Sequence, residues 1–275
     1  MCEFCKEHGE GKKWYLQAKN YSEELLNEER KIFMTEFFEK FEEMVATLVP
    51  ALDKVPFDPD AAKAIVPPLV EQFKKTHYGQ IVPIDDVEQI IDMSLSIVRM
   101  PCLCRSALLG RREARYCFGI TTFESDFMPA TFLQPYPDYS SDLEEIPKEE
   151  AKKAIRKHDH NGLVHSVWTY RTPFIGSICN CTSKECLAMK FRLRVGLPVF
   201  FKAEYVASID WENCNGCRDC MKVCNFGAVA YSPTLQKCYI NQRQCYGCGV
   251  CRAVCSRDAI TLHDRNAIPV LANEW

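Results

Sequence analysis

A four-cysteine spacing that occurs twice near the C-terminus constrains the fold more than any other feature of the chain. Residues 214–224 read CNGCRDCMKVC, and residues 245–255, which begin 31 positions later, read CYGCGVCRAVC. Both follow the pattern C-x2-C-x2-C-x3-C. Three cysteines at every third position of a tight loop can converge on one metal centre, whereas the fourth points away into a short helix. Each copy is therefore expected to supply three ligands to one centre and one ligand to its neighbour.

The two copies resemble the ligand loops of bacterial ferredoxins that bind two [4Fe–4S] clusters. The resemblance implies one cluster held by Cys214, Cys217, Cys220 and Cys255, and another held by Cys245, Cys248, Cys251 and Cys224. Zinc also suits paired CxxC motifs, but two complete runs in tandem favour two cubanes. The proline that usually follows each fourth cysteine in this family is replaced by Asn225 and Ser256, which leaves the reduction potentials open.

The internal repeat extends beyond the cysteines. Short strands are expected before each motif, at residues 205–210 and 237–241, and after each motif, at residues 227–231 and 258–262. Gly216, Gly247 and Gly249 lie between ligands, where a chain that turns closely around a cluster needs positive φ. These features predict a βαββαβ-like ferredoxin domain over residues 206–265, followed by a tail over residues 266–275.

The rest of the chain predicts helices first and a mixed region afterwards. Helical periodicity covers residues 20–54, where aromatic and aliphatic side chains form a stripe, and a break at residues 55–59 precedes a second helix over residues 60–77. The stripe indicates a packing face, directed either at its own chain or at a partner. The further expected elements are a strand at 79–83, a helix at 85–99, a loop at 127–141, a helix at 146–158 and a strand at 163–170. The expected fold class is α+β, with residues 1–60 and 61–205 as separate units before the ferredoxin domain.

Six further cysteines lie in the middle of the chain: Cys102, Cys104, Cys117, Cys179, Cys181 and Cys186. The C-x-C pairs, on extended backbone, would each place two thiols on one side, so we expect four of the six to bind a third iron–sulfur cluster. A zinc site and unmetallated or redox-active thiols are the alternatives. The nearby arginines could offset thiolate charge, grip an anionic ligand or form a solvated face. His165 could act as a ligand or proton donor, although a structural role is the commoner one for a strand histidine.

Residues 100–190 also resemble a group of longer cytoplasmic ferredoxin-like proteins of anaerobes. That group carries a CxCR segment, a later cysteine, an EEA-containing helix, a GLVH strand and an ICNC segment before the dicluster. The corresponding positions here are residues 102–105, Cys117, residues 149–151, residues 162–165 and residues 178–181. That group commonly has several further cysteines after ICNC, whereas this chain has only Cys186 before the first dicluster motif. The resemblance implies architecture more than activity.

Three cysteines remain outside these groups. Cys2 and Cys5 form a CxxC pair that could lend two ligands to a metal site completed by other segments, such as the spare middle cysteines; a disordered terminus is the alternative. Cys238 aligns with Ala207 in the internal repeat. We therefore interpret Cys238 as a small buried residue beside a cluster rather than as a ligand.

Composition narrows the class of protein. Seventeen cysteines and no apolar signal-peptide core at the N-terminus favour metal ligation in a reducing cytoplasm, and we expect an anaerobic host. A net charge of −3 argues against a general nucleic-acid binder, and no apolar stretch is long enough to span a bilayer.

These features predict an iron–sulfur electron-transfer protein in an anaerobic redox complex, more an electron-transfer component than a catalytic subunit. The chain lacks a GxGxxG fingerprint and a P-loop, so we expect the flavin or nicotinamide to belong to a redox partner, a flavoprotein or oxidoreductase subunit. One alternative is an enzyme whose third cluster, or a thiol beside it, binds substrate. A second alternative is an iron–sulfur sensor or assembly factor.

Overall fold

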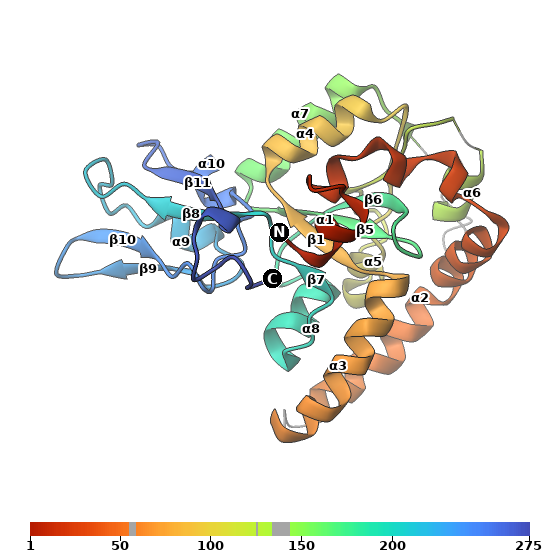
Figure 1. Cartoon of the computed structure of the whole chain (residues 1–275), viewed down its shortest axis with the longest axis horizontal. Helices are drawn as coiled ribbons and strands as arrows, with labels where there is room; N and C mark the ends of the chain where they lie inside the picture. Colours follow the sequence, from red (N-terminus) through yellow and green to blue (C-terminus); the bar gives the residue numbers. More distant parts are fainter. Residues whose placement is uncertain (55–58, 125, 134–143) are drawn as a thin grey trace.

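The structure, a computed structural model, describes residues 1–54, 59–124, 126–133 and 144–275. It has the predicted α+β class. A seven-stranded mixed sheet occupies the centre, and the cysteine-rich C-terminal segment, with two two-stranded sheets, extends to one side of it (Figure 1). No helix in these residues combines the length and the apolar character needed to cross a bilayer.

The helices are α1 (Glu3–His8), α2 (Glu28–Lys54), α3 (Pro59–Thr76), α4 (Ile84–Met93), α5 (Leu103–Leu109), α6 (Phe127–Leu133), α7 (Lys148–His160), α8 (Leu187–Val195), α9 (Asp219–Val223) and α10 (Val250–Ala253). Short 3-10 helices are η1 (Trp14–Leu16), η2 (Ala18–Tyr21), η3 (Glu23–Leu25) and η5 (Arg265–Ala267). The central sheet has the strand order β4 (Glu144–Glu145), β2 (Ser96–Met100), β3 (Cys117–Thr121), β6 (Ile175–Cys181), β5 (Val164–Thr169), β1 (Gly79–Val82), β7 (Phe200–Phe201). The remaining strands are β8 (Tyr205–Ile209), β9 (Val229–Ser232), β10 (Lys237–Ile240) and β11 (Ile260–Asp264).

Neighbouring strands of the central sheet are antiparallel, except that β1 and β7 are parallel. Strands β1, β3 and β5 are buried along their whole length, because both faces of the sheet are covered. Helices α4 and α7 run side by side on one side of the sheet, and the long pair α2 and α3 lies on the other (Figure 1). The sheet carries three of the middle cysteines, Cys117 on β3 and Cys179 and Cys181 on β6.

The apolar stripe of α2 packs on its own chain. Met34 and Phe38 are fully buried in a cluster that includes Cys102 and Cys117. One turn further on, Phe41 packs in a second cluster beside Cys104. Truncating a buried phenylalanine to alanine lowers the free energy of unfolding by about 3–5 kcal/mol. The packing of α2 against the middle cysteines therefore contributes strongly to stability. On α2, Ile32 (59% exposed) and Met44 (37% exposed) still face solvent.

Two expected helices have different limits in the structure. The helix expected from residue 20 begins at Glu28, because the Asn27 side chain accepts a hydrogen bond from the Arg30 N–H at 3.0 Å and caps it. The helix expected over residues 85–99 ends at Met93, where the Ser94 hydroxyl donates to the Ile90 carbonyl at 2.8 Å. Strand β2 follows it, with the β-branched residues that strands prefer.

Other expectations were closer. The helix expected at 146–158 is α7, the strand at 163–170 contains β5, and the strand at 79–83 is β1. The expected loop at 127–141 contains α6 over residues 127–133, whereas residues 55–58 and 134–143 lie outside the described residues. The four strands expected around the cysteine motifs form as β8 to β11, with β8 paired to β11 and β9 to β10.

Candidate metal centres

The eight cysteines of the two C-terminal motifs line two separate cavities. Cys214, Cys217, Cys220 and Cys255 line the first, and Cys224, Cys245, Cys248 and Cys251 line the second. The cavities enclose about 320 Å³ and 330 Å³, part of which is open to solvent. Each therefore takes three cysteines from one motif and the fourth from the other. This is the grouping that crossed ligation requires.

Two glycines let the ligand loops lie against the neighbouring strands. Gly216 has φ 71° and Gly247 has φ 69°. A Cβ atom at Gly216 would lie 2.2 Å from the Gln236 carbonyl oxygen, and one at Gly247 would lie 2.0 Å from the Tyr205 carbonyl oxygen. Both the positive φ and the close approach exclude a side chain, so the loops fold tightly enough for their three cysteines to converge.

Backbone N–H groups point at the sulfurs of both cavities. The Ala228 N–H donates to Cys224 Sγ at 3.2 Å, and the Ala259 N–H, at the equivalent position of the repeat, donates to Cys255 Sγ at 3.4 Å. Cys245 Sγ accepts from the Gly247 N–H at 3.3 Å. Such donors stabilise negative charge on sulfur. The cavities therefore offer preformed surroundings for thiolate ligands.

Burial makes the metal-free thiols weak acids. Desolvation raises the pKa of Cys248 well above its ordinary value, and burial together with the neighbouring Cys238 raises the pKa of Cys220 to about 12. These thiols are protonated at neutral pH without metal, so metal binding must displace protons. The donor set, four thiols per cavity with N–H groups directed at sulfur, fits a [4Fe–4S] cluster.

The two cavities differ in exposure. In the second, Cys245, Cys248 and Cys251 are all buried, whereas Cys217 in the first is exposed. The rings of Phe226 and Tyr246 stack at 3.9 Å beside the second cavity. The first cavity is thus the one closer to solvent.

Residues 213–260 match a family model described as a 4Fe-4S dicluster domain. This segment is an iron–sulfur domain of the ferredoxin type. The match does not extend to residues 1–212, and no curated protein matches the chain. The likeness to this family is therefore confined to the cysteine-rich C-terminal segment.

The six middle cysteines gather in two groups of three. Cys102 Sγ lies 3.5 Å from Cys117 Sγ, and Cys117 also shares a side-chain hydrogen bond with Cys179. In the second group, Cys186 contacts both Cys104 and Cys181. The groups adjoin, because Cys179 interacts electrostatically with Cys102, Cys104 and Cys186. Each C-x-C pair contributes one cysteine to each group.

The two C-x-C pairs have different backbones. Cys179 and Cys181 lie on strand β6, so alternation places both on one face while Asn180 points to the other. Cys102, by contrast, is the extended residue before α5, and Cys104 is in its first turn. The expectation of extended backbone thus holds for the second pair and is wrong for the first. The α5 start nevertheless brings Cys104 to Cys186.

Arg105 is the arginine that serves the middle cysteines directly. It is 2% exposed, and its Nη1 donates to Cys102 Sγ at 3.3 Å and to the Asn180 carbonyl at 3.1 Å. Burial opposes its charge, but the negative fields of Cys181 and Cys102 outweigh burial, so that the pKa of Arg105 is raised. An ion pair with Glu185 at 2.9 Å fixes its other side. This geometry fits the charge-offset role considered for the arginines.

Arg111 and Arg112, further from the sulfurs, have carboxylate partners instead. Arg111 pairs with Glu185 at 3.0 Å, and Arg112 pairs with Glu42 at 3.6 Å. His165 is fully buried, with Nδ1 2.6 Å from Asn180 Oδ1 and Nε2 3.5 Å from an Asp159 carboxylate oxygen. These contacts describe a histidine that anchors Asn180 behind the cysteine pairs.

The spacing of sulfurs bears on the zinc alternative. Among the described residues, the one group that brings three ligand atoms within 4.8 Å of one another is Cys2, Cys5 and Glu204. All six middle cysteines are described, yet they form no group that tight. A tetrahedral zinc site would hold all of its sulfurs about 3.8 Å apart, from a Zn–S distance of about 2.3 Å; pairs such as Cys102 and Cys117 are that close, at 3.5 Å, but no set of three is.

Asn225 joins the ferredoxin domain to the middle cysteines. It follows Cys224, at the position where the family has proline. Its Oδ1 accepts from the Ser183 N–H at 2.7 Å, and its Nδ2 donates to the Gly162 carbonyl at 2.9 Å. Ser183 stands two residues after Cys181, so one side chain connects the second cavity with the six-cysteine site. The sequence showed the missing proline but not this contact.

Replacing Asn225 with alanine should loosen that connection. We expect the Ser183 amide hydrogen to exchange about 5–30-fold faster, because the loss of its hydrogen bond costs about 1–2 kcal/mol. Native-state hydrogen exchange measures the effect. Ser256→Ala is the matched control, because Ser256 follows the other fourth cysteine and is exposed. Equal protection of Ser183 in both variants would contradict the bridging role.

The remaining predicted residues also have definite surroundings. Cys238 is 1% exposed and lines the first cavity beside Cys220. Cys2 and Cys5 are both fully buried. The potential ligand beside them is the carboxylate of Glu204, whereas the sequence suggested a middle cysteine. Glu204 was not recognised in the sequence, because a single glutamate some 200 residues away carries no spacing signal.

Proposed function

We propose that this protein transfers electrons through two [4Fe–4S] clusters in the ferredoxin domain and a third iron–sulfur cluster held by four of the six middle cysteines. The observation that carries the proposal is the convergence of these six thiols in two adjoining groups of three, with the buried Arg105 against one of them. We retain residues 206–265 as the proposed extent of the ferredoxin domain.

A [4Fe–4S] cluster ligated by four thiolates takes up and releases one electron at a time. The residues of this chain set the order of the relay. Asn225 links the six-cysteine site to the second cavity, and exposed Cys217 places the first cavity next to solvent. We infer a relay from the middle site through the second cavity to the first, where a redox partner can dock. A flavin or nicotinamide would then belong to that partner in a larger complex.

Iron analysis tests the proposal. Anaerobically purified protein should contain about twelve irons and about twelve acid-labile sulfides per chain, since each cubane contributes four of each. A measured content of eight irons per chain, in protein whose seventeen cysteines are all unmodified, would contradict the third cluster. Eight irons with a zinc ion that Cys104→Ser abolishes would assign the middle cysteines to zinc.

The three-and-three grouping favours a second candidate function, an enzyme whose third cluster binds substrate. A group of three thiolates leaves one iron of a cubane without a protein ligand, and such an iron can bind an exogenous molecule. Cyanide distinguishes the two functions. The relay predicts an unchanged EPR spectrum after cyanide addition, whereas the enzyme predicts a shift of the third signal alone.

A further inference from the structure

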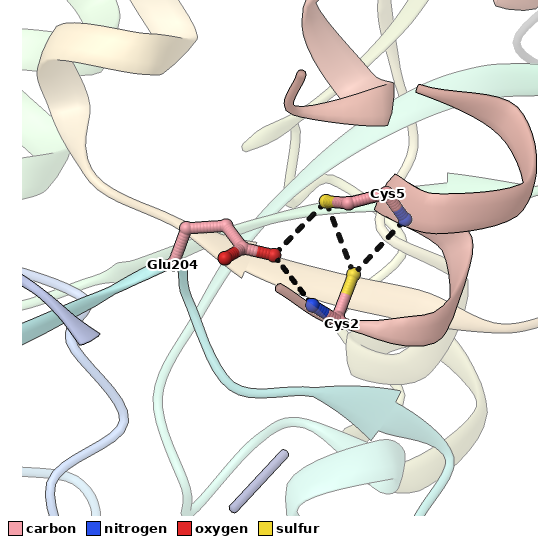
Figure 2. Close-up of side chains that lie close together, drawn as sticks. All are labelled: Cys2, Cys5 and Glu204. Atoms are coloured by element: carbon pink, nitrogen blue, oxygen red, sulfur yellow. Dashed lines mark hydrogen bonds between the residues drawn. The ribbon is translucent and has the colours of Figure 1, made fainter. Parts of the chain in front are cut away.

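Cys2, Cys5 and Glu204 form a buried group that the iron–sulfur relay does not use. Figure 2 shows the Cys5 thiol and the Cys2 backbone nitrogen directed at the Glu204 carboxylate, and the Cys2 thiol directed at Cys5. Cys2 Sγ lies 3.2 Å from Cys5 Sγ, and Cys5 Sγ lies 2.9 Å from Glu204 Oε1. The exposed fractions are 0% for both cysteines and 3% for Glu204. Three groups that can each become anionic are therefore packed together away from solvent.

We propose that Cys2, Cys5 and Glu204 bind one zinc ion, separate from the iron–sulfur clusters. Two thiolates and a carboxylate are ligands that zinc prefers. In tetrahedral geometry, zinc distances of about 2.3 Å to sulfur and 2.1 Å to oxygen give edges of about 3.8 Å between sulfurs and about 3.6 Å between sulfur and oxygen. The observed separations are slightly shorter, so a small outward movement of the side chains admits the ion.

The positive charge that acts on Glu204, that of Arg265, does so through its electrostatic field and not by direct contact. Among the residues that the structure describes, no lysine, arginine or histidine forms an ion pair with Glu204. Its hydrogen-bond donors are the Cys5 thiol at 2.9 Å, the Cys2 N–H at 3.0 Å and Asn266 Nδ2 at 3.0 Å, all of them neutral. A buried charge that is held only by neutral donors is costly. A divalent cation between the three groups would offset that cost directly.

A supporting shell already holds the ligands in place. The Cys5 N–H donates to Cys2 Sγ at 3.4 Å, so the CxxC turn is fixed by its own backbone. Gln80, fully buried, has Oε1 3.6 Å from Cys2 Sγ, and the same oxygen accepts a hydrogen bond from Trp14 Nε1. The side-chain amide nitrogen of Gln80, Nε2, donates to the Lys202 carbonyl at 3.1 Å. Such outer contacts orient ligands and raise metal affinity.

The guanidinium group of Arg265 supplies a positive charge next to the proposed site. Two thiolates and a carboxylate around Zn²⁺ carry one net negative charge. Arg265 is fully buried and donates to the Ala203 carbonyl at 3.0 Å and to the Tyr205 carbonyl at 2.8 Å, one on each side of Glu204. Arg265 also donates to the Cys245 carbonyl at 2.9 Å. The ion would thus fasten the N-terminal segment to the junction with the ferredoxin domain.

Metal analysis of the full chain tests the site independently of iron. Anaerobically purified wild-type protein should contain about one zinc per chain, and X-ray absorption at the zinc edge should show two sulfur ligands with oxygen or nitrogen donors completing the shell. A zinc shell of four sulfurs, or no zinc at all, overturns the proposal. This measurement needs no variant, so a folding defect cannot obscure it.

Variants then assign the ligands. Cys5→Ser and Glu204→Gln should weaken zinc binding in a chelator competition by at least the 10–100-fold seen when outer-shell partners are lost. Glu212→Gln, a matched change at an exposed glutamate, and Cys104→Ser in the middle site should both retain the zinc. Full zinc retention by Cys5→Ser, or a Cys2–Cys5 disulfide in the anaerobic wild-type protein, contradicts the site. Failure of the relay would instead appear as missing iron with zinc still bound.

Discussion

Replacing Cys224 with alanine should remove the cluster of the second cavity and spare that of the first. Cys224 belongs by sequence to the first motif, yet it lines the second cavity with Cys245, Cys248 and Cys251. The loss of one of four thiolates should lower the iron bound there by between one and about four atoms per chain. EPR of the reduced protein, with iron analysis, measures the change.

The control for this variant is Cys238→Ala. Cys238 lies beside the first cavity and is almost fully buried. The equivalent position in the other copy of the repeat is Ala207, which cannot be a ligand. We expect both clusters to survive in Cys238→Ala. The reciprocal variant, Cys255→Ala, should disturb the first cavity. If Cys224→Ala selectively disturbed the cluster of Cys214, Cys217 and Cys220, crossed ligation would be wrong.

Replacing Cys104 or Cys181 with alanine should abolish the third EPR signal and leave the two ferredoxin-type signals. Both residues contact Cys186, and neither lines a ferredoxin cavity. The loss should amount to about four of about twelve irons per chain. Cys5→Ser, a substitution of another fully buried cysteine, should keep all three signals because it affects the proposed zinc site alone.

EPR and iron analysis of variants in the other group of three, Cys102, Cys117 and Cys179, identify which cysteines bind the third cluster. Cys102→Ala and Cys117→Ala remove members of the group nearest Arg105. Loss of the third signal in variants of both groups indicates one centre shared between them. Three signals retained in every single variant of the six would show that these thiols hold no cluster.

The local sequence was sufficient for the ferredoxin domain because its information is local. Ligand spacing, glycines and short strands lie within about sixty residues, and the two copies reinforce each other. Strands β8 to β11 and the positive φ of Gly216 and Gly247 were therefore predictable. The same reasoning failed at residues 96–99, since an apolar run of that length fits either a helix end or a buried strand. Pairing with β3 decides it as strand β2.

Long-range contacts decided the rest. The sequence by itself determined the two cysteine motifs, their ferredoxin type and the presence of six further thiols in the middle of the chain. Only the tertiary structure decided how those six divide, because β3, β6 and two helix starts meet there from positions up to 84 residues apart. It also brought Glu204 to Cys2 and Cys5, and Asn225 to Ser183. Such encounters depend on the packing of a whole sheet against its helices, and no periodicity or spacing along the chain records them.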